Sequence, residues 1–266
     1  MAKMTLIIRP QPDADRDVAL LGRYGVPALA SPSMTCFFQL NELPEPNRFS
    51  GIILTSRNAV DAIIKASKKN SLPYFNKNTD TNEWTKLPAF VVGTATAAAA
   101  RDAGFSNIVV GNGGGAGLLA PISHYFTSKM GKEVGDTSDV LRLFWPSAFE
   151  ISFDMVSALA GQGVVVQRLP VYQMIANDMM DPQITEKIEQ GAIAAVVAMS
   201  PRSAQIFRDN LAAAGKSSSI KKVSLIAGSA KIAAAAGTGW KAVYIARQPR
   251  RSRLLAIAVL QHQRNH

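Results

Sequence analysis

Four short turns of small polar residues have the chemistry to bind carboxylates, and we call them the strand-end turns. Each follows an apolar run and comes before a stretch that could begin a helix. In an open parallel sheet, ligands bind beyond the carboxyl ends of the strands. There, helix N-termini present free N–H groups and the positive end of the helix dipole. The candidate residues are Thr55, Ser56, Gly93, Thr94, Ala95, Thr96, Ser200, Pro201, Gly228 and Ser229.

The same turns also have a purely structural interpretation. A Ser or Thr before a helix is usually an N-cap, so Ser56, Thr96 and Ser200 could each be only that. However, the turns occur as two pairs, one in each half of the chain, and both pairs keep the same order. The first pair lies in residues 54–60 and 92–97, and the second in residues 198–204 and 227–232. This repetition favours binding for the set and indicates two similar domains that face a shared cleft.

Tyr172 is the candidate proton donor. It follows an apolar run at residues 164–168, where the chain would cross between the two domains. A phenol has an ordinary pKa of about 10, so at neutral pH it keeps its proton and can deliver it to a leaving hydroxyl. The alternative is a packed amphipathic ring, the more usual role of a tyrosine at a strand end.

Several other kinds of site find no support in the residues. His124 is the only histidine outside the tail and Cys36 is the only cysteine, so the usual zinc ligand sets cannot be assembled and we expect no metal. No serine-nucleophile elbow and no Lys-containing phosphate loop is present. The glycine-rich residues 111–117 have the context of a dinucleotide loop, but the next strand ends without an acidic residue. A flexible connection is the favoured interpretation of that loop.

The alternation of short apolar runs with helix-like stretches predicts parallel sheets covered by helices. One set of five strands is expected at residues 52–55, 90–93, 108–110, 141–144 and 164–168, and a second at residues 5–9, 26–29, 194–199, 223–227 and 242–245. The chain would therefore begin one domain, build the whole of the other, and return. Domain 1 would comprise residues 1–33 and 173–266, domain 2 residues 40–168, and the linkers residues 34–39 and 169–172. Residues 68–86 are interpreted as a solvated excursion.

Composition agrees with two domains, since 266 residues with 47% hydrophobic content can form two buried cores. No run is long enough for a signal-peptide core or a membrane span, and we expect a cytoplasmic monomer. The formal charge of +10 would attract polyanions. Arg247, Arg250, Arg251 and Arg253, followed by apolar residues 254–260, could serve nucleic acid or a membrane surface, or could simply begin the last helix of domain 1. Aromatic residues interleaved with charges are lacking, so nucleic-acid binding is not favoured.

The paired turns, their order and the Val171-Tyr172 pair between them resemble the uroporphyrinogen-III synthase family, from about Arg9 to about Ile245. The resemblance implies an α/β fold with two flavodoxin-like domains, each a parallel five-stranded sheet flanked by helices, joined by a two-strand linker. It also implies cyclisation of linear hydroxymethylbilane to uroporphyrinogen III, with inversion of the last pyrrole through a spiro intermediate, loss of water and no cofactor. Tyr172 matches the tyrosine thought to help expel the hydroxyl. Arg9 matches an arginine that closes the first strand, and we assign it a substrate carboxylate.

This chain departs from the family pattern at three places, one of which is residues 27–40, where it matches only by position and apolar character. The second copy of the motif usually reads Gly-Pro-Thr-Thr, whereas here it reads Gly228-Ser229-Ala230-Lys231, and Lys231 would replace the missing hydroxyls as a carboxylate partner. After residue 144 an Arg-Gly pair is usual, whereas this chain has Trp-Pro-Ser-Ala-Phe-Glu. The alternative function is a non-catalytic two-domain binding protein for an anionic small molecule. A transient contact with the preceding pathway enzyme stays open.

Overall fold

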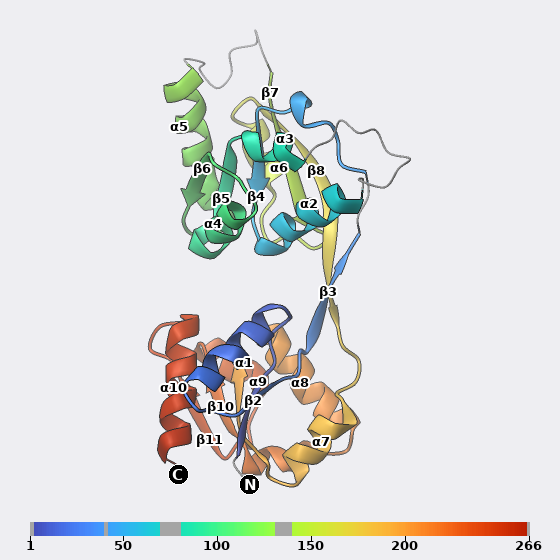
Figure 1. Cartoon of the computed structure of the whole chain (residues 1–266), viewed down its shortest axis with the longest axis vertical. Coiled ribbons are helices and arrows are strands. Elements are labelled where there is room, and N and C mark those ends of the chain that lie inside the picture. The colour runs from blue at the N-terminus through green and yellow to red at the C-terminus, as the bar shows by residue number, and fades with distance from the viewer. Residues whose placement is uncertain (1–2, 40–41, 70–80, 131–139, 265–266) are drawn as a thin grey trace. The chain divides into compact units, whose positions relative to one another are not determined.

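The structure is a computed structural model that describes residues 3–39, 42–69, 81–130 and 140–264. The chain forms two compact units (Figure 1). Unit 1 comprises Met1–Cys36 and Met174–His266, and unit 2 comprises Phe37–Gln173. Within the described residues, no helix is both long and apolar enough to cross a membrane.

Unit 1 is built on a sheet of five parallel strands in the order β11-β10-β9-β1-β2. The strands are β1 (Met4–Ile7), β2 (Ala28–Ala30), β9 (Ile193–Ala198), β10 (Ser224–Ala227) and β11 (Ala242–Ile245). The helices are α1 (Asp13–Arg23), α7 (Pro182–Glu189), α8 (Pro201–Ala213), α9 (Ala230–Ala236) and α10 (Arg251–Arg264), with a 3-10 helix at Ser217–Lys222.

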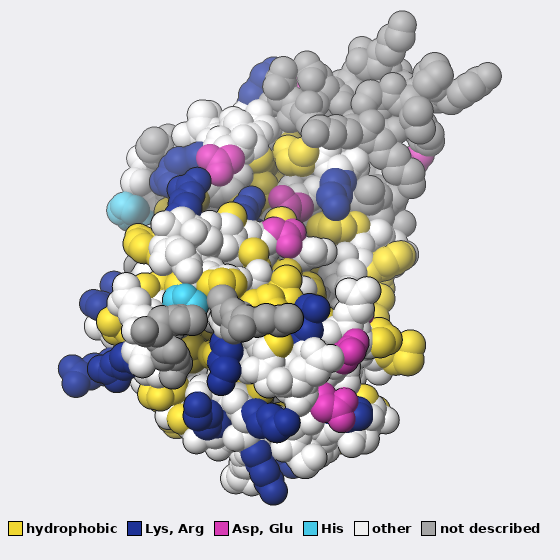
Figure 2. All heavy atoms as spheres, turned by 60° about the horizontal axis from the view of Figure 1, so that its bottom comes forward, with side chains coloured by type: hydrophobic (Ala, Val, Ile, Leu, Met, Phe, Trp, Pro, Cys, Tyr) yellow, Lys and Arg dark blue, Asp and Glu magenta, His cyan; other side chains and the backbone are white. Residues whose placement is uncertain are grey.

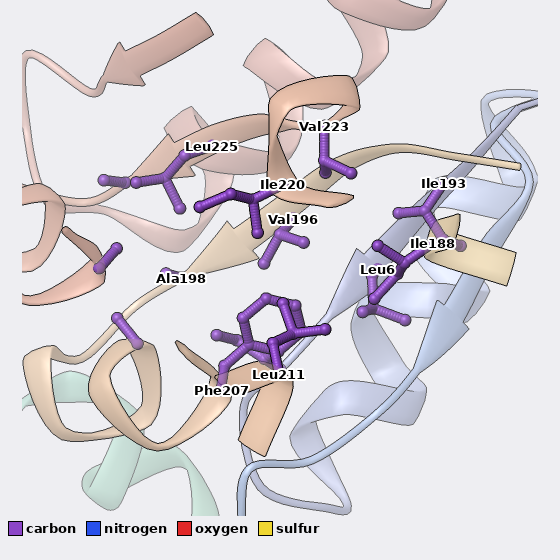
Figure 3. Close-up of a cluster of buried hydrophobic side chains, with 14 of the residues drawn as sticks. Leu6, Ile188, Ile193, Val196, Ala198, Phe207, Leu211, Ile220, Val223 and Leu225 are labelled. Carbon is purple, nitrogen blue, oxygen red and sulfur yellow. The ribbon is translucent and has the colours of Figure 1, made fainter. Parts of the chain in front are cut away.

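Both faces of this sheet are covered, which explains why its strands read as continuous apolar runs. On one face, Leu6 and Val196 pack with Phe207 of α8 and with side chains of α7 and α9 (Figure 3). On the other face, Ile7 and its neighbours pack with α1 and α10. Successive residues of β1 therefore enter opposite cores, as the strand pleat requires.

Unit 2 is built on a six-stranded sheet in the order β3-β8-β7-β4-β5-β6. The strands are β3 (Met34–Phe38), β4 (Gly51–Leu54), β5 (Ala89–Val92), β6 (Ile108–Gly111), β7 (Leu141–Ala148) and β8 (Val164–Ala176). The helices are α2 (Arg57–Lys69), α3 (Thr81–Lys86), α4 (Gly93–Asp102), α5 (Leu119–Met130) and α6 (Met155–Ala160), with 3-10 helices at Pro46–Arg48 and Gly115–Leu118. One core joins Ile53, Phe90 and Leu143 to α5 and α6. Elsewhere in unit 2, Phe144 packs against the rings of Phe49 and Trp84.

Two sequence predictions about unit 2 are wrong in part. The sheet has six strands and mixed direction instead of five parallel strands, because β3 pairs antiparallel with the end of β8. The Gln39 N–H donates to the Val171 carbonyl at 3.0 Å, and the Asn177 N–H donates to the Ser33 carbonyl at 2.9 Å. The supposed solvated excursion at residues 68–86 ends in α3, whose Trp84 is only 3% exposed. Residues 70–80 of that segment lie outside the described residues.

Candidate functional site

The strand-end turns lie at the carboxyl ends of neighbouring parallel strands, as predicted. In unit 2, one turn follows β4 and the other follows β5, and these strands pair directly. In unit 1, the turns follow β9 and β10, which also pair. The turns after β4, β9 and β10 lead into α2, α8 and α9, whereas residues 93–96 already form the first turn of α4. The geometry that lets helix N-termini face an anion is therefore present once in each unit.

Three of the six hydroxyl residues in these turns are N-caps. Ser56 accepts a hydrogen bond from the Asn58 N–H at 3.1 Å. Ser200 accepts one from the Ser203 N–H at 3.0 Å, and Ser229 accepts one from the Ile232 N–H at 3.3 Å. The N-cap interpretation is confirmed for Ser56 and Ser200, but it is wrong for Thr96, which is buried inside α4. Because one cap satisfies only part of a helix's first turn, backbone N–H groups are left for an anion.

Gly93 begins α4 in a conformation that only glycine adopts readily. Its φ is +75°, and a Cβ built there would meet nothing within 4 Å. The conformation lets the chain turn from β5 directly into α4, since the first helical residue follows Val92 without a connecting loop. Thr94 and Ala95, the next two residues, lie at the start of that helix, and both are exposed.

Arg9 and Lys231 occupy different surroundings in unit 1. The Arg9 guanidinium lies 2.6 Å from the Asp13 carboxylate and 3.1 Å from that of Asp17. Asp17 is fully buried and also accepts a hydrogen bond from Arg251. Lys231 is exposed in the first turn of α9. Arg9 therefore already holds two carboxylates, whereas Lys231 projects into solvent.

Tyr172 lies beside a cavity that belongs wholly to unit 2. The cavity has a volume of about 180 Å³, and its lining includes Thr55, Trp145, Glu150 and Tyr172. Tyr172 is 6% exposed, and the Trp145 indole N–H lies 3.5 Å from the Thr55 hydroxyl. The structure thus brings together Tyr172 and one strand-end turn of unit 2.

Sequence reasoning missed most of the cavity wall. Trp145, Ala148 and Glu150 come from the segment where the chain departs from the family pattern, and that departure was the available signal. Gly114 and Gly115 of the glycine-rich loop also line the cavity. A Cβ on Gly115 would come within 2.8 Å of the Phe153 ring, so glycine is needed for this close approach.

Charge is distributed without a dominant basic patch on the face that Figure 2 shows, where Lys and Arg side chains lie scattered among polar ones. The arginines from Arg247 to Arg253 precede or begin α10, whose Leu254 and Leu255 are buried in unit 1. The structural interpretation of that segment is therefore confirmed, and these two apolar residues face a core and not a membrane. Among the described residues, no group of three or more His, Cys, Asp or Glu is placed to hold a metal ion.

Asp154, next to the cavity-lining Phe153 and Met155, has a lowered pKa. It caps α6, accepting hydrogen bonds from the N–H groups of Val156 at 3.0 Å and Ser157 at 3.2 Å. The Ser157 hydroxyl donates a third at 2.6 Å. The Ser157 hydroxyl bond, together with these N–H groups and the charge of Arg168, lowers the pKa of Asp154 from its ordinary value of 3.8.

Fold and site define a two-unit α/β protein whose candidate ligand groups lie at the carboxyl ends of its strands. The family model described as uroporphyrinogen-III synthase HemD matches residues 15–256. The chain belongs to the uroporphyrinogen-III synthase family, whose members are enzymes of tetrapyrrole biosynthesis. This confirms the family, and the class of enzyme, expected from the paired turns.

One solved structure supports the fold, and a second is similar along nearly its whole length. The uroporphyrinogen-III synthetase from Helicobacter pylori is 15% identical, with 97% of this chain and 99% of that chain covered and a TM-score of 0.59. A mutant uroporphyrinogen III synthase from the extremely thermophilic bacterium Thermus thermophilus is 17% identical, with 98% of each chain covered and a TM-score of 0.48.

Proposed function

We propose that this chain cyclises hydroxymethylbilane to uroporphyrinogen III, with inversion of the last pyrrole, and that Tyr172 supplies the proton for the departing hydroxyl. The observation that carries the role of Tyr172 is its place beside the unit 2 cavity, together with Thr55 and Trp145. The cavity therefore has a proton donor in the same wall as the end of β4, where helix N–H groups attract anions.

The proposed reaction begins with loss of water. The Tyr172 hydroxyl donates its proton to the leaving hydroxyl, and the bilane becomes an azafulvene-like cation. Attack by the substituted carbon of the last pyrrole gives a spiro intermediate, which fragments and recloses with that ring inverted. The proton released as the ring system regains aromaticity balances the one that Tyr172 gave, so the sum is loss of one water without a cofactor.

Orientation is the second part of the proposal. The bilane alone closes without inversion, so the protein must hold this flexible polycarboxylate in the pose that favours the crowded attack. We assign its carboxylates to the strand-end turns: Thr55, Ser56, Gly93, Thr94, Ala95 and Thr96 in unit 2, and Ser200, Pro201, Gly228 and Ser229 in unit 1. The backbone N–H groups of these turns would donate to the carboxylates, except at Pro201, which has no N–H and would only shape its turn. Lys231 would add a charge, and Arg9 would contribute the N–H groups that Asp13 and Asp17 leave unused. The net charge of +10 supports capture of such a substrate.

We also propose the finer organisation. Residues 1–33 with 173–266, and residues 40–168, would be two flavodoxin-like domains joined by residues 34–39 and 169–172. The strand order of unit 1 supports this, because it follows the 2-1-3-4-5 pattern of that fold. The monomeric state, the cytoplasmic location and any contact with the preceding enzyme stay predictions.

The deciding experiment supplies fresh hydroxymethylbilane with and without the protein and separates the oxidised porphyrins by isomer. We expect isomer III to dominate over the spontaneous isomer I when the protein is present. An unchanged background of isomer I, from protein shown to be folded by circular dichroism, would contradict the proposal. Binding of the bilane without isomer III would then favour the anionic-ligand binding protein.

A further inference from the structure

Arg168 of β8 makes an unusual set of contacts with the neighbouring strand β7. Its Nε donates to the Ser147 hydroxyl at 2.9 Å. One terminal nitrogen donates to the Ala148 carbonyl at 3.0 Å and to the Phe149 carbonyl at 2.8 Å. The guanidinium carbon lies 5.7 Å from the centre of the Trp145 ring, within range of a cation–π contact.

These contacts occur where the backbone ladder between the two strands is weakest. Pro146 of β7 lies opposite Leu169, and Pro170 of β8 lies opposite Ser147. Neither proline has an N–H to donate, so two donors are missing from one short stretch. The register then shifts, because Ser147 pairs with Pro170 but Ala148 pairs with Tyr172.

The register shift determines how Tyr172 is presented. Val171 is the extra residue, with no counterpart on β7, and its carbonyl instead accepts a hydrogen bond from the Gln39 N–H, just after β3. An extra residue of this kind bends a strand and re-aims the side chains that follow it. Tyr172 is the next residue, and its own carbonyl accepts a hydrogen bond from the Phe149 N–H at 3.0 Å.

A continuous series of hydrogen bonds therefore connects Arg168 to Tyr172. The guanidinium holds the carbonyls of Ala148 and Phe149, and the Phe149 N–H holds the Tyr172 carbonyl. The same stretch of β7 also carries Trp145 and Ala148, which line the cavity with Tyr172. Arg168 itself is not part of the cavity lining. It therefore acts through the wall and not on the ligand.

We infer that Arg168 is a positioning residue for Tyr172. Its side-chain hydrogen bonds replace the ladder bonds lost at the prolines and the bulge, and so hold Tyr172 in the orientation that proton donation requires. This inference rests on the proposed function of Tyr172. Arginine suits the task because a planar fork can hold several oxygens and stack on an indole, whereas the ammonium of lysine is a single point donor.

The kinetic experiment is a double-mutant cycle between Arg168→Ala and Tyr172→Phe. We expect Arg168→Ala to lower kcat roughly 10- to 100-fold, as misplacement of a catalytic group by about an ångström can do, while KM changes by less than about threefold. In the Tyr172→Phe background the same change should cost less than about threefold, since coupled residues are not additive. Arg168→Lys keeps the charge without the fork and should restore only part of kcat. Arg142→Ala, an exposed arginine at the other end of β7, is the matched control and should leave kcat unchanged.

A second readout does not depend on turnover. Amide hydrogen exchange should become at least about tenfold faster at Phe149 in Arg168→Ala and in Arg168→Lys, but not in Arg142→Ala. The reason is that the guanidinium no longer holds the carbonyls of residues 148 and 149. Equal losses of kcat in the two backgrounds, or unchanged exchange at Phe149, would overturn the inference. Isomer I alone from the wild-type protein would overturn the proposed function and the catalytic part of this inference with it. Faster exchange at Phe149 in the Arg168 variants would then show that the function had failed, while the hydrogen bonds of Arg168 still order this segment.

Discussion

The two units arrange their strands in the same spatial order, but equivalent strands come at different points along the chain. Unit 1 reads β2-β1-β9-β10-β11 across its sheet, and unit 2 reads β8-β7-β4-β5-β6 beside the added β3. The paired turns make β4 the counterpart of β9, and β5 the counterpart of β10, so β7 and β8 correspond to β1 and β2. The pair that comes first along the chain in unit 1 comes last in unit 2. The shared arrangement therefore does not depend on the order of the strands along the chain.

The units differ most at the strand ends. In unit 1, Arg9 after β1 is held by Asp13 and by the buried Asp17, and Arg251 closes the network. In unit 2, the corresponding β7 leads into a cavity wall with Trp145 and Tyr172. Similar strand ends therefore carry an ion-pair network in unit 1 and a cavity lined by Tyr172 in unit 2.

The largest expected effect tests whether the two units are stabilised separately. Phe144→Ala in unit 2 and Phe207→Ala in unit 1 each remove a buried ring, and each should lower the stability of its own unit by about 3–5 kcal/mol. Hydrogen exchange measured by mass spectrometry at rising denaturant concentration reports each unit by its own peptides. Equal loss in both units from either change would show a single cooperative core and break the comparison.

The ionic network of unit 1 gives the next largest effect. Asp17→Asn leaves Arg9 and Arg251 without their buried counter-charge and should lower the free energy of unfolding by about 3 kcal/mol, as measured by urea denaturation. Asp15→Asn alters an exposed carboxylate of the same helix and serves as the control, with a change within about 0.5 kcal/mol. Similar values for the two variants would remove the stabilising role from the network.

Loss of the Tyr172 hydroxyl tests the chemistry assigned to unit 2. Tyr172→Phe should lower kcat about 100-fold, roughly 2.7 kcal/mol, while leaving the fold intact. The measurement is the initial rate of isomer III formation. Tyr244→Phe changes a half-buried tyrosine of unit 1 and should leave the rate unchanged. Wild-type rates from Tyr172→Phe would remove that hydroxyl from the mechanism.

The smallest effect concerns acid stability at α6, the unit 2 counterpart of α1. Folding lowers the pKa of Asp154 below 3.8, so its carboxylate favours the folded state above that pH. The contribution is lost as the pH falls below 3.8 and through the folded-state pKa. Urea denaturation of wild-type protein and Asp154→Ala should therefore differ at pH 7 and converge at strongly acidic pH. A difference that stays constant with pH would assign the effect to helix propensity instead.

The sequence predicted the strands well because both faces of each sheet are buried. Runs such as the one around Ile53 are apolar throughout, and all ten expected strands are present. Residues 34–39 were predicted as an extended linker, but their place as a sixth strand of the sheet was missed because β3 is partly exposed and pairs only with the extension of β8. Trp84 was misjudged because the polar residues around it do not reveal the aromatic rings it packs against.

The site was less predictable than the fold. The turns were predicted from residue types, whereas Tyr172 was favoured as a proton donor only through the family resemblance. The cavity wall depends on a one-residue register shift that no local pattern predicts. The acidic partners of Arg9 could have been found, since Asp13 and Asp17 stand four and eight residues later on one helix face. Arg168 could not, because its partners on β7 are defined by pairing across two strands.

The discontinuity of unit 1 has a consequence for the protein during translation. Met4 of β1 pairs with residues near Ile193, whereas unit 2 is one continuous segment, Phe37–Gln173. We expect unit 2 to fold first on the ribosome, while the apolar β1 still lacks its partner strand β9. The nascent chain would then need protection at its amino-terminal end until residues 193–198 emerge, which makes β1 the expected binding site for a chaperone.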